Sequence, residues 1–173
     1  RHTRYGTVTG VQTCALPICI RHAMDPEAAR EVRLAGCNNL YLSFDGVTAR
    51  TNPKNHWEIP YALDSCRKTG TTVVFVPTVI KSINDHELGG IIRYAQKNMD
   101  VVHAVNFQPV SLTGRMGKSE REKYRITVPD CIQRIEEQTN GEVTVDDWFP
   151  VPSCMPDRKS TRLNSSHSSV SRM

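Results

Sequence analysis

The 173-residue sequence lacks long hydrophobic runs, a high aromatic content and a dense set of cysteines. No apolar stretch approaches the roughly 18 residues that a membrane-spanning helix needs, so we expect no transmembrane segment. Hydrophobic residues make up 38% of the chain, charged residues 23% and aromatic residues 6%. These values exclude disordered, collagen-like and disulfide-dense proteins. Length and composition together predict one globular domain.

Several catalytic and metal-binding motifs are also missing. The sequence has no glycine-rich phosphate loop and no Ser–His–Asp pattern of a hydrolase. Cys37, Cys66, Cys131 and Cys154 are widely spaced and form no C-x-x-C pair, which predicts neither a zinc site nor a disulfide framework. We expect free thiols in a reducing, cytoplasmic compartment, with Cys37 and Cys66 in the core.

The two ends of the chain differ from its middle. Residues 8–18 (VTGVQTCALPI) and 157–167 (DRKSTRLNSSH) match translations of one common sequencing adapter, read in opposite orientations. A single index sequence, read in both directions, also accounts for the residues beside these strings. We therefore predict that residues 1–18 and 157–173 are adapter-derived, non-native and disordered.

The net charge of +4 belongs to these ends. Residues 19–156 carry 16 basic and 17 acidic side chains, a net charge of −1. Proteins that bind nucleic acid through its phosphates need a basic surface that displaces counterions. The sequence therefore predicts no nucleic-acid partner.

Helical and strand patterns alternate along residues 19–156. An Asp-Pro-Glu start predicts a helix over residues 25–34, and the β-prone run NLYLSF predicts a strand that follows it. This order, with strands about 30 residues apart, predicts an α/β fold with a parallel sheet. Three strands cannot close a barrel, so we expect a domain cut short. The expected helices are 25–34, 55–68, one that is capped by Asn84 or Asp85 and runs to 98, and 129–138. The expected strands are 39–44, 71–80 and 100–107. Residues 111–125 are expected to be polar and mobile, and residues 146–156 to be irregular.

Polar side chains follow all three predicted strands, at the edge of a parallel sheet where ligands usually bind. The candidate binding residues are Ser43, Asp45, Thr78, Asn84, Asn106 and Gln108.

Each group has a structural alternative. Asp45 and the glycine after it are typical of a turn, and Asn84 with the acids after it is typical of a helix N-terminus. We expect His86 to lie on the surface and His103 to be packed within its strand. Gln108, at a strand end before a proline, is the hardest of these residues to explain by structure alone.

The strings YLSFDGVTARTNPKNHWEIP, TVIKSINDHELGGIIRYA, VNFQPVSLTGRM and DDWFPVPSC resemble radical S-adenosylmethionine enzymes. More narrowly, they are similar to an archaeal-type subgroup that includes tetraether lipid synthases and pterin methylases. The resemblance implies an α/β fold that is a fragment of a partial (β/α)6 barrel. Residues 19–110 would be its back half, and 111–156 a C-terminal extension with a short helix and an irregular tail. Cys19 would be a glycine in the intact gene.

The resemblance also implies roles for the candidate residues around S-adenosylmethionine. Ser43 would hydrogen-bond the ribose or carboxylate, and Asp45 would shape the rim of the site. The other positions would lie beside the cofactor or on its adenine or substrate side: Thr78, Asn84, Asn106 and Gln108.

The family's cofactors include a four-iron four-sulfur cluster held by a Cys-x3-Cys-x2-Cys loop, which is absent from this sequence. We therefore expect the chain to be inactive alone, although its parent would be an enzyme. Cys154 is the candidate ligand of an auxiliary cluster, and a free thiol is the alternative.

The favoured activity at this stage is hydrogen abstraction that couples lipid chains into a tetraether, with pterin methylation second. A non-catalytic ligand-binding relative is a third possibility. A metal-independent lyase or isomerase would have to use Asp45 and His86. Expected partners are a small-molecule or lipid substrate and an electron donor such as ferredoxin or flavodoxin, in the cytoplasm or at the membrane periphery.

Overall fold

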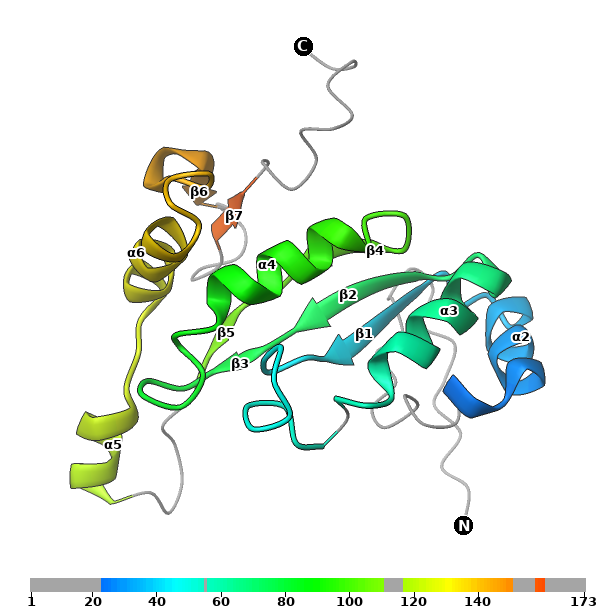
Figure 1. Cartoon of the computed structure of the whole chain (residues 1–173), viewed down its shortest axis with the longest axis horizontal. Coiled ribbons are helices and arrows are strands. Elements are labelled where there is room, and N and C mark those ends of the chain that lie inside the picture. The colour runs from blue at the N-terminus through cyan, green and yellow to red at the C-terminus, as the bar shows by residue number, and fades with distance from the viewer. Residues whose placement is uncertain (1–22, 55, 111–116, 151–157, 161–173) are drawn as a thin grey trace.

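The computed structural model describes residues 23–54, 56–110, 117–150 and 158–160 (Figure 1). Its helices and strands alternate through the first two thirds of this range. The helices are α2 (Pro26–Leu34), α3 (Ile59–Thr69), α4 (Leu88–Lys97), α5 (Lys118–Tyr124) and α6 (Val128–Gln138), with a 3-10 turn η1 (Val145–Asp147); the strands are β1 (Asn39–Ser43), β2 (Thr72–Val76), β3 (Thr78–Val79), β4 (Val102–Val105), β5 (Gln108–Pro109), β6 (Trp148–Pro150) and β7 (Arg158–Ser160).

The central sheet has three parallel strands in the order β1-β2-β4. The short parallel pair β3–β5 continues the direction of β2 and β4 beyond Pro77. Proline has no backbone N–H for the ladder, which explains why the predicted strand 71–80 is divided at this residue. The prediction of a parallel α/β fold is confirmed. The described residues do not show a barrel.

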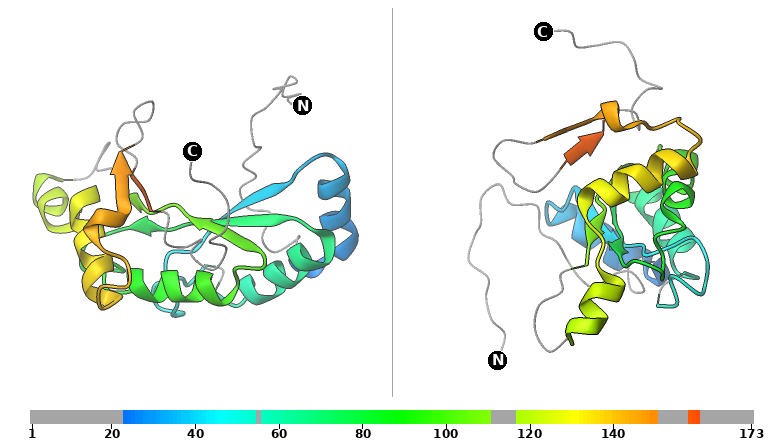
Figure 2. Two further views of the ribbon diagram at one scale, coloured as in Figure 1. Left: turned by 90° about the horizontal axis from the view of Figure 1, so that it is seen from above. Right: turned by 90° about the vertical axis from the view of Figure 1, so that its left-hand side faces the viewer.

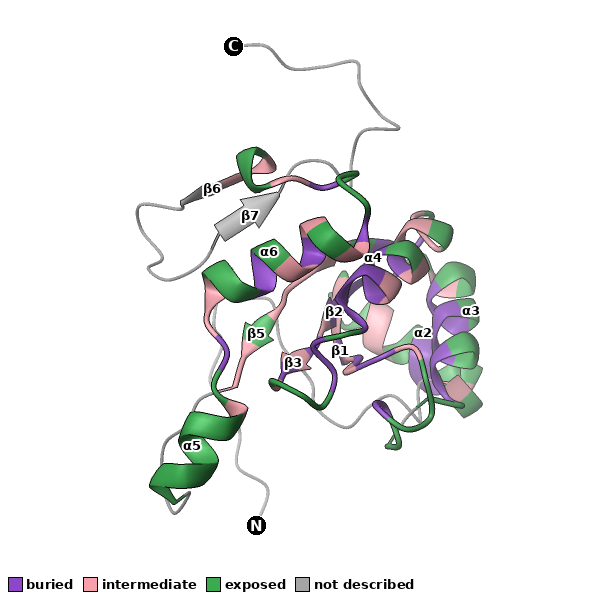
Figure 3. Cartoon of the chain, turned by 60° about the vertical axis from the view of Figure 1, so that its left-hand side comes forward, coloured by how far each residue is buried: buried purple, intermediate pink, exposed green. Residues whose placement is uncertain are grey.

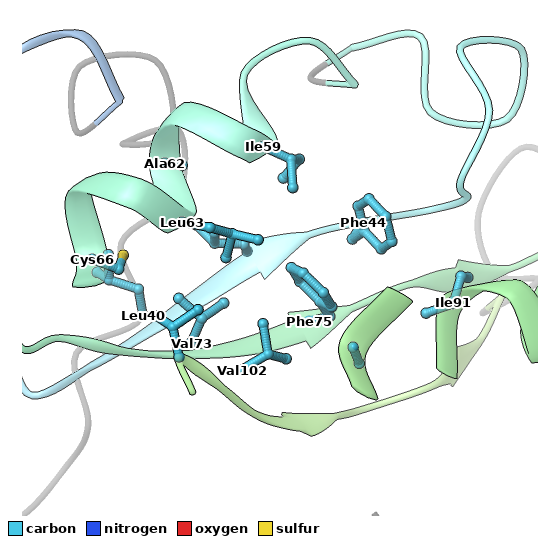
Figure 4. Packing of buried hydrophobic residues seen from close by; sticks show 13 residues of the cluster. Leu40, Phe44, Ile59, Ala62, Leu63, Cys66, Val73, Phe75, Ile91 and Val102 are labelled. Carbon is cyan, nitrogen blue, oxygen red and sulfur yellow. The ribbon is translucent and has the colours of Figure 1, made fainter. Parts of the chain in front are cut away.

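Helices α3 and α4 lie along one face of the sheet, and α2 stands at the end of the sheet beside α3, as the left view of Figure 2 shows. Every second residue of the strands points to this face, among them Leu40 of β1 and Phe75 of β2, both buried. Leu63 and Cys66 of α3 pack against them (Figure 4). Cys66 is a core residue as predicted, whereas Cys37 is only half-buried at the edge of this cluster.

A second core joins α6 to the end of the sheet. It consists of Val79, Leu88, Ile92, Ile126, Cys131, Ile135 and Val143. The buried sides of α4 and α6 face each other, while α5 is exposed along its length (Figure 3). Gly89 permits this approach, because a Cβ there would lie 2.7 Å from Cβ of Gln138.

Local capping signals place some helices correctly and misplace others. The Asp25 side chain accepts hydrogen bonds from the N–H groups of Glu27 and Ala28, both at 3.1 Å, so α2 begins as predicted. The prediction that Asn84 or Asp85 caps α4 is wrong, since α4 begins at Leu88 after a series of turns. Helix α5 occupies part of the stretch 111–125, which was expected to be polar and mobile.

The C-terminal part of the described chain is more regular than its sequence predicts. Strand β6 lies within the segment expected to be irregular and pairs with β7 in an antiparallel ladder. Strand β7 lies within the segment that we predict to be adapter-derived. Among the described residues, no helix has the length and apolar character needed to cross a membrane.

Candidate ligand-binding site at the strand ends

The face of the sheet opposite α3 and α4 carries the predicted site residues. Side chains alternate between the two faces of a strand. Since Leu42 and Phe44 point into the core, Ser43 and Asp45 point to the other face. No described helix lies over this face in the left view of Figure 2. We call it the open face.

The strand register aligns the candidates in two rows across the open face. Ser43 pairs with Val76 in the ladder, and Thr78 pairs with Gln108. Asn106 stands two residues before Gln108 and therefore on the same side; its N–H donates to Phe75 O at 2.7 Å. The structure thus brings five of the six predicted residues to one face, at the carboxyl ends of the strands: Ser43, Asp45, Thr78, Asn106 and Gln108.

Asp45 and Asn84 tie the strand ends together. The Asp45 carboxylate accepts the Thr78 N–H at 2.7 Å and lies 3.4 Å from the Ser43 hydroxyl. The Asn84 amide donates to the carbonyls of Asp45 and Thr78 at 2.7 and 2.8 Å, and accepts the N–H of Ile80 at 2.8 Å. Asn84 is buried, so its side chain holds the rim of the site from inside the protein.

Asn106 and Gln108 offer hydrogen-bonding groups to a ligand. Asn106 is partly exposed and Gln108 is exposed. Within the described residues, neither side chain has a hydrogen-bond partner, and neither has the hydroxyl of Thr78. These three side chains can donate to and accept from a ligand that lies along the open face. Their arrangement suits a molecule with several polar edges.

Glu87 is a contributor to this region that the sequence patterns did not reveal. Its carboxylate is buried and accepts hydrogen bonds from the loop that follows β1. Burial acts to raise the pKa of Glu87, but hydrogen bonds from Thr51, Thr48 and the backbone outweigh it and hold the pKa below its ordinary value. The sequence places Glu87 where a first-turn acid would stand, and no pattern of spacing separates the two roles.

The histidine predictions have different outcomes. His86 is exposed as predicted, and its imidazole lies 3.7 Å from Glu87 rather than against Asp45. This contact gives no support to an acid–base pair of Asp45 and His86. The prediction that His103 is packed is wrong, because it is exposed. The register of β4 shifts at this point, and His103 is the residue that the ladder with β2 skips.

The described residues contain no group of three or more histidine, cysteine or acidic side chains placed to hold a metal ion. Cys37, Cys66 and Cys131 form no disulfide bond with one another. Burial raises the pKa of the Cys131 thiol to about 12, so it stays protonated and is a poor metal ligand. Cys154 lies outside the described residues.

The fold and this face define a parallel α/β protein with polar side chains at the carboxyl ends of its strands. No protein-family model matches the chain. The chain is homologous to a protein of Methanocaldococcus jannaschii named 7,8-dihydro-6-hydroxymethylpterin dimethyltransferase. The two are 42% identical over 158 aligned residues, which cover 82% of this chain and 31% of the relative. The chain thus spans about a third of the relative's length.

This relative changes the order of the functional hypotheses. Its name gives a pterin as the substrate and methyl transfer as the reaction. Tetraether lipid coupling, the favoured activity in the sequence analysis, is not supported. The pterin methylase, which was the alternative, fits the comparison better.

Proposed function

We propose that the chain forms part of the S-adenosylmethionine site of a radical S-adenosylmethionine enzyme that methylates a pterin. The observation that carries the proposal is the alignment of five predicted residues on the open face, in a chain 42% identical to a pterin dimethyltransferase. The resemblance of the sequence to radical S-adenosylmethionine enzymes implies that these residues contact the cofactor. The structure provides a shared surface on which one ligand can contact them.

The residues on the open face fit this cofactor. S-adenosylmethionine presents ribose hydroxyls, an adenine edge and an amino-acid end, and each of these needs hydrogen-bond partners. Asn106 and Gln108 have side-chain amides without partners within the described residues, and amides can pair with both donors and acceptors of an adenine edge. Ser43 and Asp45 stand at the end of β1, which β2 separates from β4; there they would contact the ribose.

The iron–sulfur cluster does not fit the described residues, because they contain no suitable set of ligands. Such a cluster would supply the electron for radical chemistry in the whole enzyme. The part that we assign to this chain is binding and orientation. The open face would fix the adenosine, while Asp45 keeps the ends of β1 and β3 at a constant separation.

We assign a pterin rather than a lipid as the substrate class, in line with the relative's name. A pterin is a compact ring with polar edges, and the open face offers polar side chains at short intervals. A ferredoxin or flavodoxin remains the proposed electron donor for the whole enzyme.

A chimera tests this function. The aligned segment of the M. jannaschii relative would be replaced by the matching segment of this chain, and the product assayed anaerobically with 7,8-dihydro-6-hydroxymethylpterin and S-adenosylmethionine. We expect methylated pterin, and a large loss of activity when Gln108→Ala is added. Gln133→Ala, an exposed glutamine on α6, is the matched control and should leave activity unchanged.

An active chimera that is indifferent to Gln108→Ala would contradict the assignment of the open face. A chimera that folds and cleaves S-adenosylmethionine but never methylates the pterin would contradict the assigned substrate class.

A further inference from the structure

The buried carboxylate of Glu87 accepts several hydrogen bonds from the loop that follows β1. Glu87 Oε2 accepts the N–H of Val47 at 2.7 Å and the hydroxyl of Thr51 at 2.7 Å, with a longer contact of 3.3 Å to the N–H of Thr48. Its Oε1 accepts the Thr48 hydroxyl at 2.8 Å. These donors lie 36 to 40 residues away in sequence, so the contacts join two separate strand ends.

The carboxylate also lies against the backbone of Gly46. A Cβ at Gly46 would be 2.5 Å from Oε2 of Glu87 and 2.0 Å from the Thr51 hydroxyl. Both distances are far shorter than a carbon–oxygen contact allows, so only glycine can occupy this position without displacing the loop. Glu87 therefore fixes the chain at the residue immediately after Asp45.

Asp45 is consequently held from two sides. Asn84, three residues before Glu87 in the same connection, donates to the Asp45 carbonyl at 2.7 Å. Glu87 fixes the residues that follow. Between them, the Asp45 carboxylate reaches across the open face to the Thr78 N–H. A displacement of the loop would rotate Asp45 and alter the spacing of the two strand ends.

We propose that Glu87 is a positioning residue for the ligand-binding face: it fixes residues 46–51 and through them sets the orientation of Asp45 beside the cofactor. This inference rests on the proposed function. Glu87 acts through Asp45, since its carboxylate is buried and accepts hydrogen bonds from the loop residues Val47, Thr48 and Thr51.

The role requires an ionised carboxylate of this length. Two oxygens accept from two hydroxyls and two backbone amides. Glutamine is neutral, so its remaining oxygen would accept more weakly from Val47 and Thr51, and its NH2 group would force the Thr48 hydroxyl to accept instead of donate. Aspartate is one methylene shorter and would withdraw the oxygens from Gly46. The pKa of Glu87, which lies below its ordinary value, agrees with these contacts.

Binding of S-adenosylhomocysteine to the isotope-labelled chain tests the proposal. This probe retains the adenosine and the amino-acid end. We expect Glu87→Gln to fold, to shift the Val47, Thr48 and Thr78 amide resonances, and to raise the Kd roughly tenfold, the effect of losing about one charged hydrogen bond. Glu137→Gln, which changes an exposed glutamate on α6, should leave the Kd unchanged.

Two outcomes would overturn the proposal. In the first, Glu87→Gln moves the loop resonances but binds the probe within about twofold of the wild type. In the second, the loop resonances stay in place. If Glu87→Gln fails to fold, Thr51→Val removes one donor at nearly constant shape and is expected to raise the Kd by a smaller factor; an unchanged Kd would again contradict the role.

A different outcome would contradict the proposed function and not the role of Glu87: the wild-type chain does not bind the probe at all. The positioning claim is then decided by the Thr78 amide, which reports on Asp45 without a ligand. An unshifted Thr78 resonance in Glu87→Gln would overturn it, and a shifted one would support it.

Discussion

Single residues at the strand ends have roles that their types alone do not reveal. A strand end in a parallel sheet limits where a polar side chain can point. The sequence could therefore predict that four polar side chains share one face: Ser43, Asp45, Asn106 and Gln108. Asn84 was predicted as a ligand residue or a helix cap, yet its amide bonds three backbone groups inside the protein. Such bonds depend on the folded positions of distant strands, which no local pattern specifies.

Gly46 provides the sharpest test at the residue scale. Gly46→Ala would place a methyl group in the space of the Thr51 hydroxyl and the Glu87 carboxylate, and we expect a loss of roughly 2–4 kcal/mol in the free energy of unfolding. Gly117→Ala is the control, since its nearest neighbour would lie at 3.9 Å. Urea denaturation of both variants checks this, and equal stabilities would contradict the close packing around Gly46.

The ionisation of Glu87 predicts a pH dependence. Because the pKa of Glu87 is lowered in the folded state, its ionised form stabilises the fold. That contribution is complete above the pKa of an unfolded glutamate, about 4.3, and is lost as the pH falls through the lower folded value. The difference in unfolding free energy between the wild type and Glu87→Gln should therefore be constant near neutral pH and shrink in acid.

Denaturant titrations of the two proteins at a series of pH values measure this difference. Other carboxylates with lowered pKa, such as Asp100 and Asp130, are present in both proteins and cancel. A difference that grows as the pH falls would contradict an ionised Glu87 in the fold.

At the scale of elements, helix ends with local caps were predictable and those set by tertiary contacts were not. Helix α2 begins where Asp25 caps it, and α6 begins with a reciprocal pair of hydrogen bonds between Thr127 and Asp130. The start of α4 is set instead by its packing against α6. There, Gln138 accepts the Gly89 N–H at 2.9 Å and donates to the Asp85 carbonyl at 2.7 Å.

Substitutions at two adjacent glycines of α4 distinguish the effect of packing on stability from the effect of helix propensity. Gly89→Ala would bring a Cβ to 2.7 Å from the Gln138 side chain and 2.9 Å from its carbonyl oxygen, which should push α6 away and cost about 1–3 kcal/mol. Gly90→Ala meets only the two methyl groups of Val47, at 3.2 and 3.6 Å. It should be neutral or stabilise by up to about 1 kcal/mol, since alanine favours helix.

Thermal or urea unfolding of this pair measures both effects, and the Ile135 resonances of α6 report on docking. Equal destabilisation by the two substitutions would contradict the packing of α6 on Gly89. Stabilisation by Gly89→Ala would do so more strongly.

At the scale of the whole molecule, the described chain is a parallel sheet covered by helices on one face (Figure 2). The alternation of helices and strands in the sequence predicted the parallel sheet, because each strand needs a helical crossover to reach its parallel neighbour. From the sequence alone, a lipid substrate was placed before a pterin, because no pattern in the sequence distinguishes the two classes. The homologue, of which the chain spans 31%, is the source of the pterin assignment.

The most direct test of the account is a titration of the isotope-labelled chain with S-adenosylhomocysteine, followed by amide resonances. We predict saturable shifts of the Thr78 and Gln108 backbone amides and of the side-chain amides of Asn106 and Gln108, all reduced in Gln108→Ala and retained in Gln133→Ala. Shifts confined to α5 and α6, or no shifts at any concentration of the probe, would contradict a cofactor-binding role for the open face.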